Sequence, residues 1–476
     1  MSLDSKKFSK LKRNFVNIFS IGDLIGMKAT LLMILPSKFV IIILKRIVDS
    51  EYLLQRESIK FFQKSSIEYA GQKIARSNRL LLTALRLLGP SLPTSYIVLL
   101  QSCVRITAKH PNQRTIFSGS VLEATHALDT MTFDATGWYQ LSRGLFSLGY
   151  FRAAWVAREN SLELSITEGR NQFAYNTITK RAIEAHLERR NFSSVCELLS
   201  EFSSEMTTDS YSEIVDYLEM MQGCYLISKE HQSDFPESEK LFFNLVSRQT
   251  AFVGAGSPTS NYGREIDSSE TIVRLRYVGK KYLPAENFHG SRCDISSYNT
   301  LKVLALLCES GTTDSFLDDL KIIIGRISES RDLPDLQKIG EKPIVWINRK
   351  LPVYRSTAVS GIRVLFSILR FSPKHLKLFG FDFYSLPAMY DDTSLNFYRD
   401  GHGWQLGDPF KPGTSTAAKD LVPAGTFSFH DPVSNFCFAQ NLYKAGLFDI
   451  EPYGKSILEL TPYQYVERLE EMLGDW

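Results

Sequence analysis

The sequence lacks closely paired cysteines. Its 476 residues include six cysteines, and none of them forms a C-x-x-C pattern. This spacing excludes a disulfide-dense miniprotein and offers no zinc framework, so we interpret the cysteines as reduced, mostly buried thiols of a cytosolic protein. With 44% hydrophobic, 12% aromatic and 22% charged residues, the composition also excludes a mostly disordered or collagen-like chain.

Most of the chain has no excess of positive or negative residues. The formal net charge is +3, but residues 1–50 carry nine lysines and arginines against three aspartates, so the remaining residues sum to −3. A nearly neutral body argues against a general nucleic-acid binder. We therefore expect no nucleic-acid partner, and the basic surplus belongs to the N-terminal segment.

No apolar run is long and continuous enough for an obvious membrane span. Residues 24–44 are strongly apolar, but Lys28, Pro36 and Lys38 interrupt them, whereas a spanning helix needs about 20 apolar residues. No clean small-residue cleavage site of a signal peptide follows. The sequence predicts a basic amphipathic segment over 1–50. It either lies on an anionic membrane surface or packs on the body as an N-terminal helix.

Residues 51–248 are predicted to form an all-α domain. Apolar residues recur there at three- and four-residue spacing, with few glycines and prolines. One stretch resembles a tetratricopeptide-like helical hairpin, with a weaker echo after it, although an ordinary helical domain is the alternative. The hairpin pattern comprises Trp138, Leu141, Leu145, Leu148, Gly149, Tyr150, Phe151, Ala153, Ala154 and Ala157, and its echo Ala182, Ala185, Leu187, Asn191, Phe192 and Val195.

Residues 249–476 are predicted to form an α/β domain. Short apolar runs alternate there with helical patterns, which is typical of a parallel sheet with helices on both faces. Ligands of such sheets bind at the carboxyl ends of the strands. The predicted strands are 251–254, 271–277, 344–347 and 376–383, and the predicted helices are 299–310, 314–328, 357–370 and 433–446.

A glycine-rich turn follows the first predicted strand. Gly254, Gly256, Ser257 and Asn261 stand directly after an apolar run, where backbone N–H groups and the next helix N-terminus can approach a phosphate. The third glycine of the dinucleotide fingerprint and the G-K-S/T of a Walker A loop are both missing. Alone, the turn indicates either a phosphate site or a plain strand-to-helix connection.

Three sequence blocks then follow in order. The first runs from Val253-Gly254 through Gly263, Ile266-Asp267-Ser268 and Arg274 to Gly290-Ser291-Arg292. The second joins Ser360-Gly361 to Phe379-Gly380-Phe381, and the third is Phe429-His430-Asp431. This order resembles the large, small and very small sialyl motifs (L, S and VS) of the eukaryotic-type sialyltransferase family.

The resemblance implies a Rossmann-like, GT-B-variant fold and an inverting glycosyltransferase. Such an enzyme moves an acidic sugar from a CMP donor to a hydroxyl of a glycan or glycolipid. His430 is the implied general base, because a neutral imidazole accepts a proton near physiological pH. CMP-sialic acid is the first candidate donor and CMP-linked 3-deoxy-octulosonate (Kdo) the second. The implied donor-binding residues are Gly254, Gly256, Ser257, Asn261, Arg274, Arg276, Ser360, Gly361 and Gly380.

The chain departs from the family pattern at several positions. The usual asparagine of the glycine loop is absent, and Asn261 is a loose substitute. Arg276 replaces a second asparagine, where a guanidinium can pair with a phosphate or carboxylate. Ser434 or Asn435 stands where an acidic residue is expected after the histidine. No D-x-D follows a strand, so we expect no metal and no cofactor, the CMP-sugar being a co-substrate.

Residues 401–428 are rich in glycine, proline, serine and threonine and include His402 and Trp404. They predict either a lid over the donor or a surface loop without a role. The missing lumenal anchor and paired cysteines suggest a cytoplasmic bacterial enzyme, peripheral at the inner face of the membrane, for capsule or lipopolysaccharide synthesis. Two rival hypotheses are a non-catalytic helical-repeat scaffold and a transferase that uses another nucleotide sugar, such as a UDP-sugar.

Overall fold

The structure is a computed structural model, and its described residues fall into two compact units. One unit lies within Met1–Ser161, Ala417–Ser428 and Trp476, and the other within Leu162–Thr416 and Phe429–Asp475. The segment 1–50 and the candidate lid 401–428 lie outside the described residues, and the predicted domain boundary at residue 249 stays a prediction. The described residues are Tyr96, 98–100, 114–223, 235–254, 260–275, 277, 279–280, 283, 286–298, 316–326, 342–347, 350–385 and 430–474.

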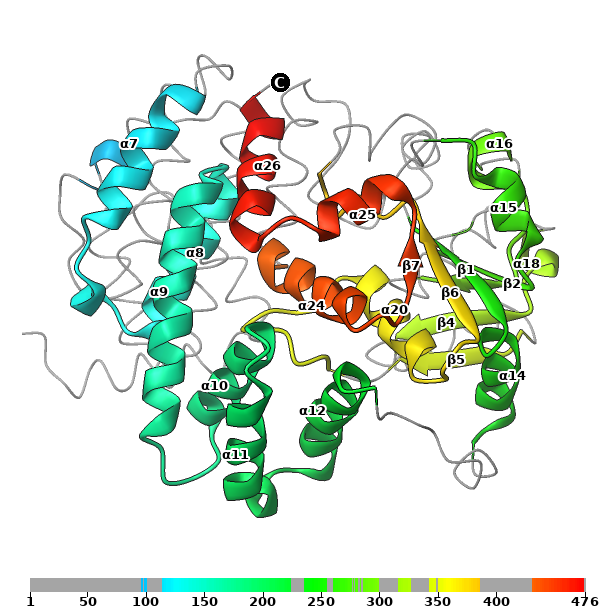
Figure 1. The fold of residues 1–476 in the computed structure, drawn as a ribbon, viewed down its shortest axis with the longest axis horizontal. Helices are drawn as coiled ribbons and strands as arrows, with labels where there is room; N and C mark the ends of the chain where they lie inside the picture. The colour runs from blue at the N-terminus through cyan, green and yellow to red at the C-terminus, as the bar shows by residue number, and fades with distance from the viewer. Residues whose placement is uncertain are drawn as a thin grey trace, which may run out of the picture. The chain divides into compact units, whose positions relative to one another are not determined.

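A parallel sheet of seven strands forms the core of the second unit (Figure 1). The strand order is β5-β4-β3-β2-β1-β6-β7, and every neighbouring pair is parallel. This confirms the prediction of an α/β fold with a Rossmann-like sheet. The strands are β1 (Gln249–Val253), β2 (Thr271–Leu275), β3 (Ile295–Ser297), β4 (Ile322–Arg326), β5 (Ile344–Ile347), β6 (His375–Phe379) and β7 (Asp449–Ile450).

The order of the sheet reverses between β1 and β6. Strand β1 pairs with β2 on one side and with β6 on the other. In Figure 1, α15 (Gly263–Ser268) and α16 (Glu286–His289) lie on one face of the sheet, and α20 (Ser360–Leu369) and α24 (Pro432–Lys444) on the other, as expected of right-handed crossovers. Open α/β sheets bind ligands outside the carboxyl ends of the strands at such a reversal. Here those ends are Gly254 and Gly380.

The central strands are apolar on both faces. Ala251, Phe252 and Val253 of β1 are each at most 2% exposed. A strand covered by helices on both sides needs a continuous apolar run and not an alternating pattern. This is why the apolar stretch at 251–254 identified β1 from sequence, whereas β5, at 344–347, is an apolar run at the edge of the sheet.

The predicted helix over 314–328 is wrong. The structure has one helical turn, α18 (Phe316–Asp319), and then strand β4. Ile322, Ile323 and Ile324 are β-branched, which favours a strand, and they pair with β3 and β5. Strands β3 and β7 were also not predicted, since β3 contains two buried serines and β7 has only two residues.

The predicted strands at 271–277 and 376–383 are shorter in the structure. Strand β2 ends at Leu275 and β6 at Phe379. After β6 the backbone turns, with φ of 65° at Gly380 and also positive φ at Phe383 and Tyr384, which no strand allows. The predicted helices at 357–370 and 433–446 correspond to α20 and α24, whereas 299–310 lies outside the described residues.

The described part of 114–221 is helical, as predicted. In the first unit, α8 ends at Gly149, whose φ of 84° is left-handed, and the Tyr150 N–H donates to the Leu145 carbonyl at 3.0 Å. These two features make a glycine-terminated helix end, and Trp138 is fully buried nearby. The remaining bounds of this region are α7 (Arg114–His126), η2 (Thr130–Thr132), α8 (Ala135–Leu148) and α9 (Phe151–Arg170).

In the second unit, α10 and α12 pack against α24, and α11 packs against α10. Asn441 of α24 donates to the carbonyl of Leu187 at 3.3 Å, and a Cβ on Gly169 of α9 would lie 2.2 Å from Cβ of Ala182. Among the described helices, none has both the length and the hydropathy to cross a bilayer. The remaining bounds are α10 (Thr177–Glu188), α11 (Phe192–Phe202), η3 (Ser203–Glu205), α12 (Thr208–Met221), α14 (Glu237–Val246), α25 (Pro452–Leu458) and α26 (Pro462–Gly474).

Candidate functional site

Three of the predicted donor-binding glycines meet at the carboxyl edge of the sheet. The Gly254 N–H donates to the Phe379 carbonyl at 2.8 Å, and a Cβ on Gly254 would lie 2.4 Å from the Gly380 carbonyl oxygen. A Cβ on Gly361, at the start of α20, would lie 3.1 Å from the phenyl ring of Phe381. Because these positions carry only hydrogen, β1, β6 and α20 can approach one another closely around that ring.

His430 lies at the same edge, directly before α24. Its Nδ1 is 2.8 Å from the carbonyl oxygen of Thr357, and the side chain is partly exposed. A carbonyl oxygen only accepts hydrogen bonds, so Nδ1 carries the proton and the lone pair resides on Nε2. The imidazole is therefore held in the tautomer that a general base needs.

Further hydrogen bonds fix the segment around His430 to the residues that lead into α20. The Asp431 N–H donates to Oγ of Ser356 at 2.8 Å, and Oγ of Ser434 donates to the Tyr354 carbonyl at 3.0 Å. The Asp431 carboxylate caps α24 by accepting from two N–H groups. We call the contacts between residues 354–359 and 430–435 the clasp.

The Asn435 amide makes one bond of the clasp and one bond within α24 and its N-cap. Its Oδ1 accepts from the Val359 N–H at 2.8 Å, and its Nδ2 donates to the Asp431 carbonyl at 2.8 Å. An ionised carboxylate can accept but not donate. The two opposite demands give a physical reason for an amide at this position, where the family resemblance leads one to expect an acid.

Changing Asn435 to alanine is expected to lower the free energy of unfolding by about 1–3 kcal/mol, because the Val359 N–H and the Asp431 carbonyl lose their partner. Asn435→Asp is expected to be equally harmful at pH 7 and to recover relative to Asn435→Ala in acid, where a protonated carboxyl can donate. Urea unfolding at both pH values measures this. Asn244→Ala, at an exposed residue of α14, is the control, and equal stability of all three variants would contradict the assignment.

A small hollow lies beside α20. It is shallow and open to solvent, with a volume of about 30 Å³. Ser360 and Arg363 face it from successive turns of α20, above the carboxyl halves of β3, β4 and β5. Its described lining residues are Ser297, Tyr298, Ile324, Gly325, Ile347, Ser360, Arg363 and Val364.

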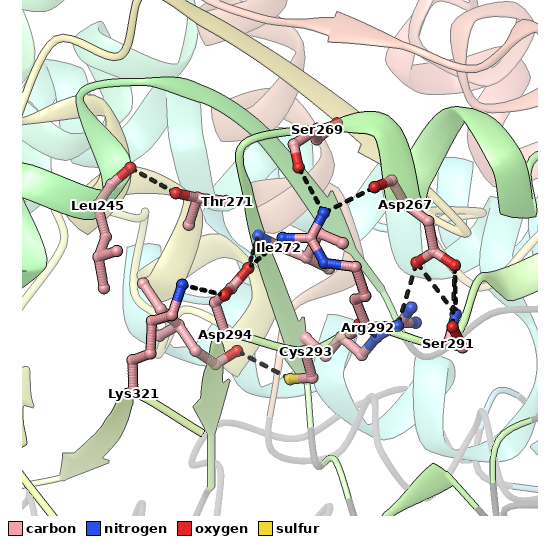
Figure 2. Close-up of polar contacts among 12 residues, drawn as sticks. Leu245, Asp267, Ser269, Thr271, Ile272, Ser291, Arg292, Cys293, Asp294 and Lys321 are labelled. Carbon is pink, nitrogen blue, oxygen red and sulfur yellow. Dashed lines mark hydrogen bonds and ion pairs between the residues drawn. The ribbon is translucent and has the colours of Figure 1, made fainter. Parts of the chain in front are cut away.

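The rest of the first sequence block gathers at the opposite, amino edge of the sheet (Figure 2). The Asp267 carboxylate, at the end of α15, accepts from the Ser291 N–H at 2.8 Å, from the Ser291 hydroxyl at 3.1 Å and from the Arg292 N–H at 3.1 Å. The Arg292 guanidinium donates hydrogen bonds to the backbone carbonyls of Asp267 and Ser269. These residues lock the entry into β2 against the entry into β3.

Arg274, within β2, also holds the segment before β3 against β2. Its side chain is 3% exposed, and its guanidinium donates to the carbonyls of Arg292 at 2.7 Å and His289 at 2.6 Å. Burial lowers its pKa from the ordinary arginine value. The contacts described for Arg274 are thus with the backbone of the chain, and a contact with the donor stays a prediction for this residue.

A buried carboxylate completes the amino edge. Asp294, 5% exposed, accepts from the Ile272 N–H at 2.9 Å and pairs with Lys321 at 2.7 Å and Arg292 at 3.4 Å (Figure 2). Two cations and a backbone donor compensate for the cost of burying this charge. The network fastens β2, β3 and β4 together where they enter the sheet.

His289 makes the stability of this edge depend on pH. Burial, together with the Arg274 charge, lowers the pKa of His289 to about 4. The unfolded chain takes up a proton near pH 6.5, so between pH 6.5 and 4 it binds more protons than the folded protein. The free energy of unfolding should therefore fall as the pH falls through that window, by up to about 3 kcal/mol. Urea unfolding from pH 7 to 4 measures it, and His289→Gln should flatten the slope. An unchanged slope in that variant would contradict the assignment.

The other predicted site residues divide into two groups. Oδ1 of Asn261 accepts a hydrogen bond from Nδ2 of Asn287 at 3.0 Å, and a contact of Asn261 with the donor stays a prediction. Gly256, Ser257, Arg276, His402 and Trp404 lie outside the described residues. Sequence analysis missed Arg363 and Ser297. Arg363 stands three residues after Ser360, on the same helix face, and this spacing was the available signal.

Within the described ranges, no group of three or more histidine, cysteine, aspartate or glutamate side chains is placed to hold a metal ion. Comparison of the chain with models of protein families, with curated proteins and with solved structures finds no match. The α/β fold and the arrangement at the carboxyl edge are therefore the observations on which a function is proposed.

Proposed function

We propose that the protein is an inverting glycosyltransferase that moves an acidic sugar from a CMP donor to a glycan hydroxyl. The observation that carries this proposal is the meeting of His430 with the start of α20 at the carboxyl edge of the sheet. The glycines at the ends of β1 and β6 adjoin the same helix. The proposed nucleotide site and the proposed general base would thus lie beside the point where the strand order reverses, which is where open α/β sheets bind ligands.

The donor would bind across the glycine turns and the start of α20. A helix N-terminus presents unsatisfied N–H groups and a partial positive charge to a phosphate, and at α20 no side chain of the N-cap residue Val359 occupies them. Gly254 and Gly361 allow β1, β6 and α20 to pack closely beside this helix N-terminus. Gly256, Ser257 and Arg276 complete this part of the proposal on the family resemblance alone.

In the transfer step, the acceptor hydroxyl oxygen attacks the anomeric carbon of the donor sugar. His430 accepts the hydroxyl proton at Nε2, a new C–O bond forms, and the bond from the anomeric carbon to the phosphate oxygen breaks. CMP leaves with the electron pair of that bond. Attack opposite to the leaving group inverts the anomeric centre. The Thr357 carbonyl, which accepts from Nδ1, stabilises the imidazolium that results.

The finer parts of the proposal come from the sequence. They are the sialyltransferase variant of the Rossmann-like fold, tetratricopeptide-like packing of the helical region, and a role in bacterial capsule or lipopolysaccharide synthesis. Residues 1–50, with their net charge of +6, would hold the protein at the inner face of the cytoplasmic membrane. Sialic acid and Kdo both carry a carboxylate at the anomeric carbon, and the choice between them is a matter for experiment.

Calorimetric titration of the full chain with CMP, UDP and GDP, without added metal, tests the donor class. We expect CMP to bind at least tenfold more tightly than UDP or GDP. Turnover of CMP-sialic acid and CMP-Kdo would then be assayed with a glycan acceptor. Preference for UDP would replace the CMP donor by another nucleotide sugar, and absence of nucleotide binding would favour the scaffold hypothesis.

A further inference from the structure

The hollow beside α20 has the chemistry of an anion site. Among its described lining residues are one guanidinium, from Arg363, and the hydroxyls of Ser360 and Ser297, but no carboxylate. An arginine side chain stays charged at all physiological pH values and offers several N–H donors in a planar fork. Hydroxyls supply additional donors. Such a lining favours an oxyanion over a neutral or cationic ligand.

The place of the hollow relates it to the glycine cluster. It lies above the carboxyl halves of β3, β4 and β5, and Ser360 in its wall is followed directly by Gly361, which packs against Phe381. Ser360 and Arg363 are three residues apart on a ten-residue helix, so both present the same face. The first turn of that helix adds its partial positive charge to the guanidinium.

We infer that Arg363, with Ser360 and Ser297, forms an oxyanion subsite for the donor, which receives either the carboxylate of its sugar or its phosphate. This inference rests on the proposed function, because it places a second negative group of the donor next to the glycine turns. An anomeric carbon that bears both groups would be held between the two. With the carboxylate as occupant, the guanidinium would hold the sugar in place as the phosphate leaves.

Binding of four compounds to Arg363→Gln and Arg363→Lys of the full chain tests the subsite. Inorganic phosphate and CMP carry the phosphate, N-acetylneuraminic acid carries the carboxylate, and cytidine carries neither. We expect Arg363→Gln to lose at least tenfold in affinity for one oxyanion class, Arg363→Lys to lose less, and cytidine to bind equally in all. Arg248→Gln, at an exposed arginine directly before β1, is the matched control, and thermal melting shows whether each variant folds.

The pattern of losses identifies the occupant. Loss for phosphate and CMP alone assigns the phosphate, and loss for N-acetylneuraminic acid alone assigns the carboxylate. If the unaltered protein binds CMP and Arg363→Gln behaves like Arg248→Gln toward every compound, the subsite is wrong and the proposed function stands. If CMP does not bind, the proposed function fails. Inorganic phosphate and N-acetylneuraminic acid then decide on the subsite alone, and absence of binding by both overturns it.

Discussion

Replacing His430 by glutamine is expected to slow sugar transfer by about 10²- to 10⁴-fold, the usual contribution of a positioned general base. Glutamine is close in size to histidine, and its amide can still donate to the Thr357 carbonyl that holds Nδ1. The local structure should therefore persist while the proton acceptor is lost. Steady-state rates with CMP-sialic acid and CMP-Kdo measure the effect.

The expected loss belongs to the rate and not to binding. Affinity for CMP, measured by calorimetry, should stay within about twofold of the unaltered protein, because the base acts on the acceptor hydroxyl. His375→Gln is the matched control, since His375 is exposed and pairs with Asp449 at the amino edge of the sheet. Full activity of the His430 variant would remove this residue from the mechanism.

Gly263→Ala is expected to destabilise the protein by more than about 3 kcal/mol. A Cβ at this position would lie 1.9 Å from the carbonyl oxygen of Glu286 and 2.8 Å from that of Asn287. Both atoms belong to the backbone of α16, so no side-chain rotation relieves the clash. The start of α16 would have to move, and with it the Asp267 contacts to Ser291.

Gly119→Ala provides the matched comparison for this substitution. Gly119 lies in α7, and a Cβ there meets nothing within 4 Å, so alanine should be neutral or stabilising by up to about 1 kcal/mol. Urea unfolding of both variants gives the difference. Equal stability of the two variants would show that α16 can shift at little cost in free energy, and that the packing of α15 against α16 contributes little to stability.

The sequence predicted those parts of the sheet that have a simple physical signature. Strands β1 and β5 are short apolar runs bounded by polar residues, and in β1 burial on both faces accounts for that pattern. Strand β4 was predicted as helix, because Leu317 and Leu320 before it continue a helical spacing into Ile323 and Ile324. Pairing with β3 and β5 determines the conformation of β4. A local sequence pattern does not indicate such pairing.

The sequence predicted the correct edge of the sheet for some candidate site residues but not for all of them. Gly254, Gly361, Gly380 and His430 all lie at the carboxyl edge of the sheet, as expected of residues that follow strands or begin helices. Arg274 comes from the same sequence block as Gly254, yet its guanidinium binds the backbone at the amino edge. The residues of a motif that runs along a strand lie at both edges of the sheet. The sequence alone does not show which of these residues contacts the ligand.

The reversal of strand order at β1 also means that the candidate site can form only late in synthesis of the chain. Strands β2 to β5 add to one side of β1 in chain order, while the other side waits for β6, so that Gln249 pairs with His375. Contacts of such long sequence separation form slowly. Until residue 380 has left the ribosome, β1 presents an unpaired edge, which is an aggregation hazard. A nascent or truncated chain that ends before β6 should therefore depend on chaperones.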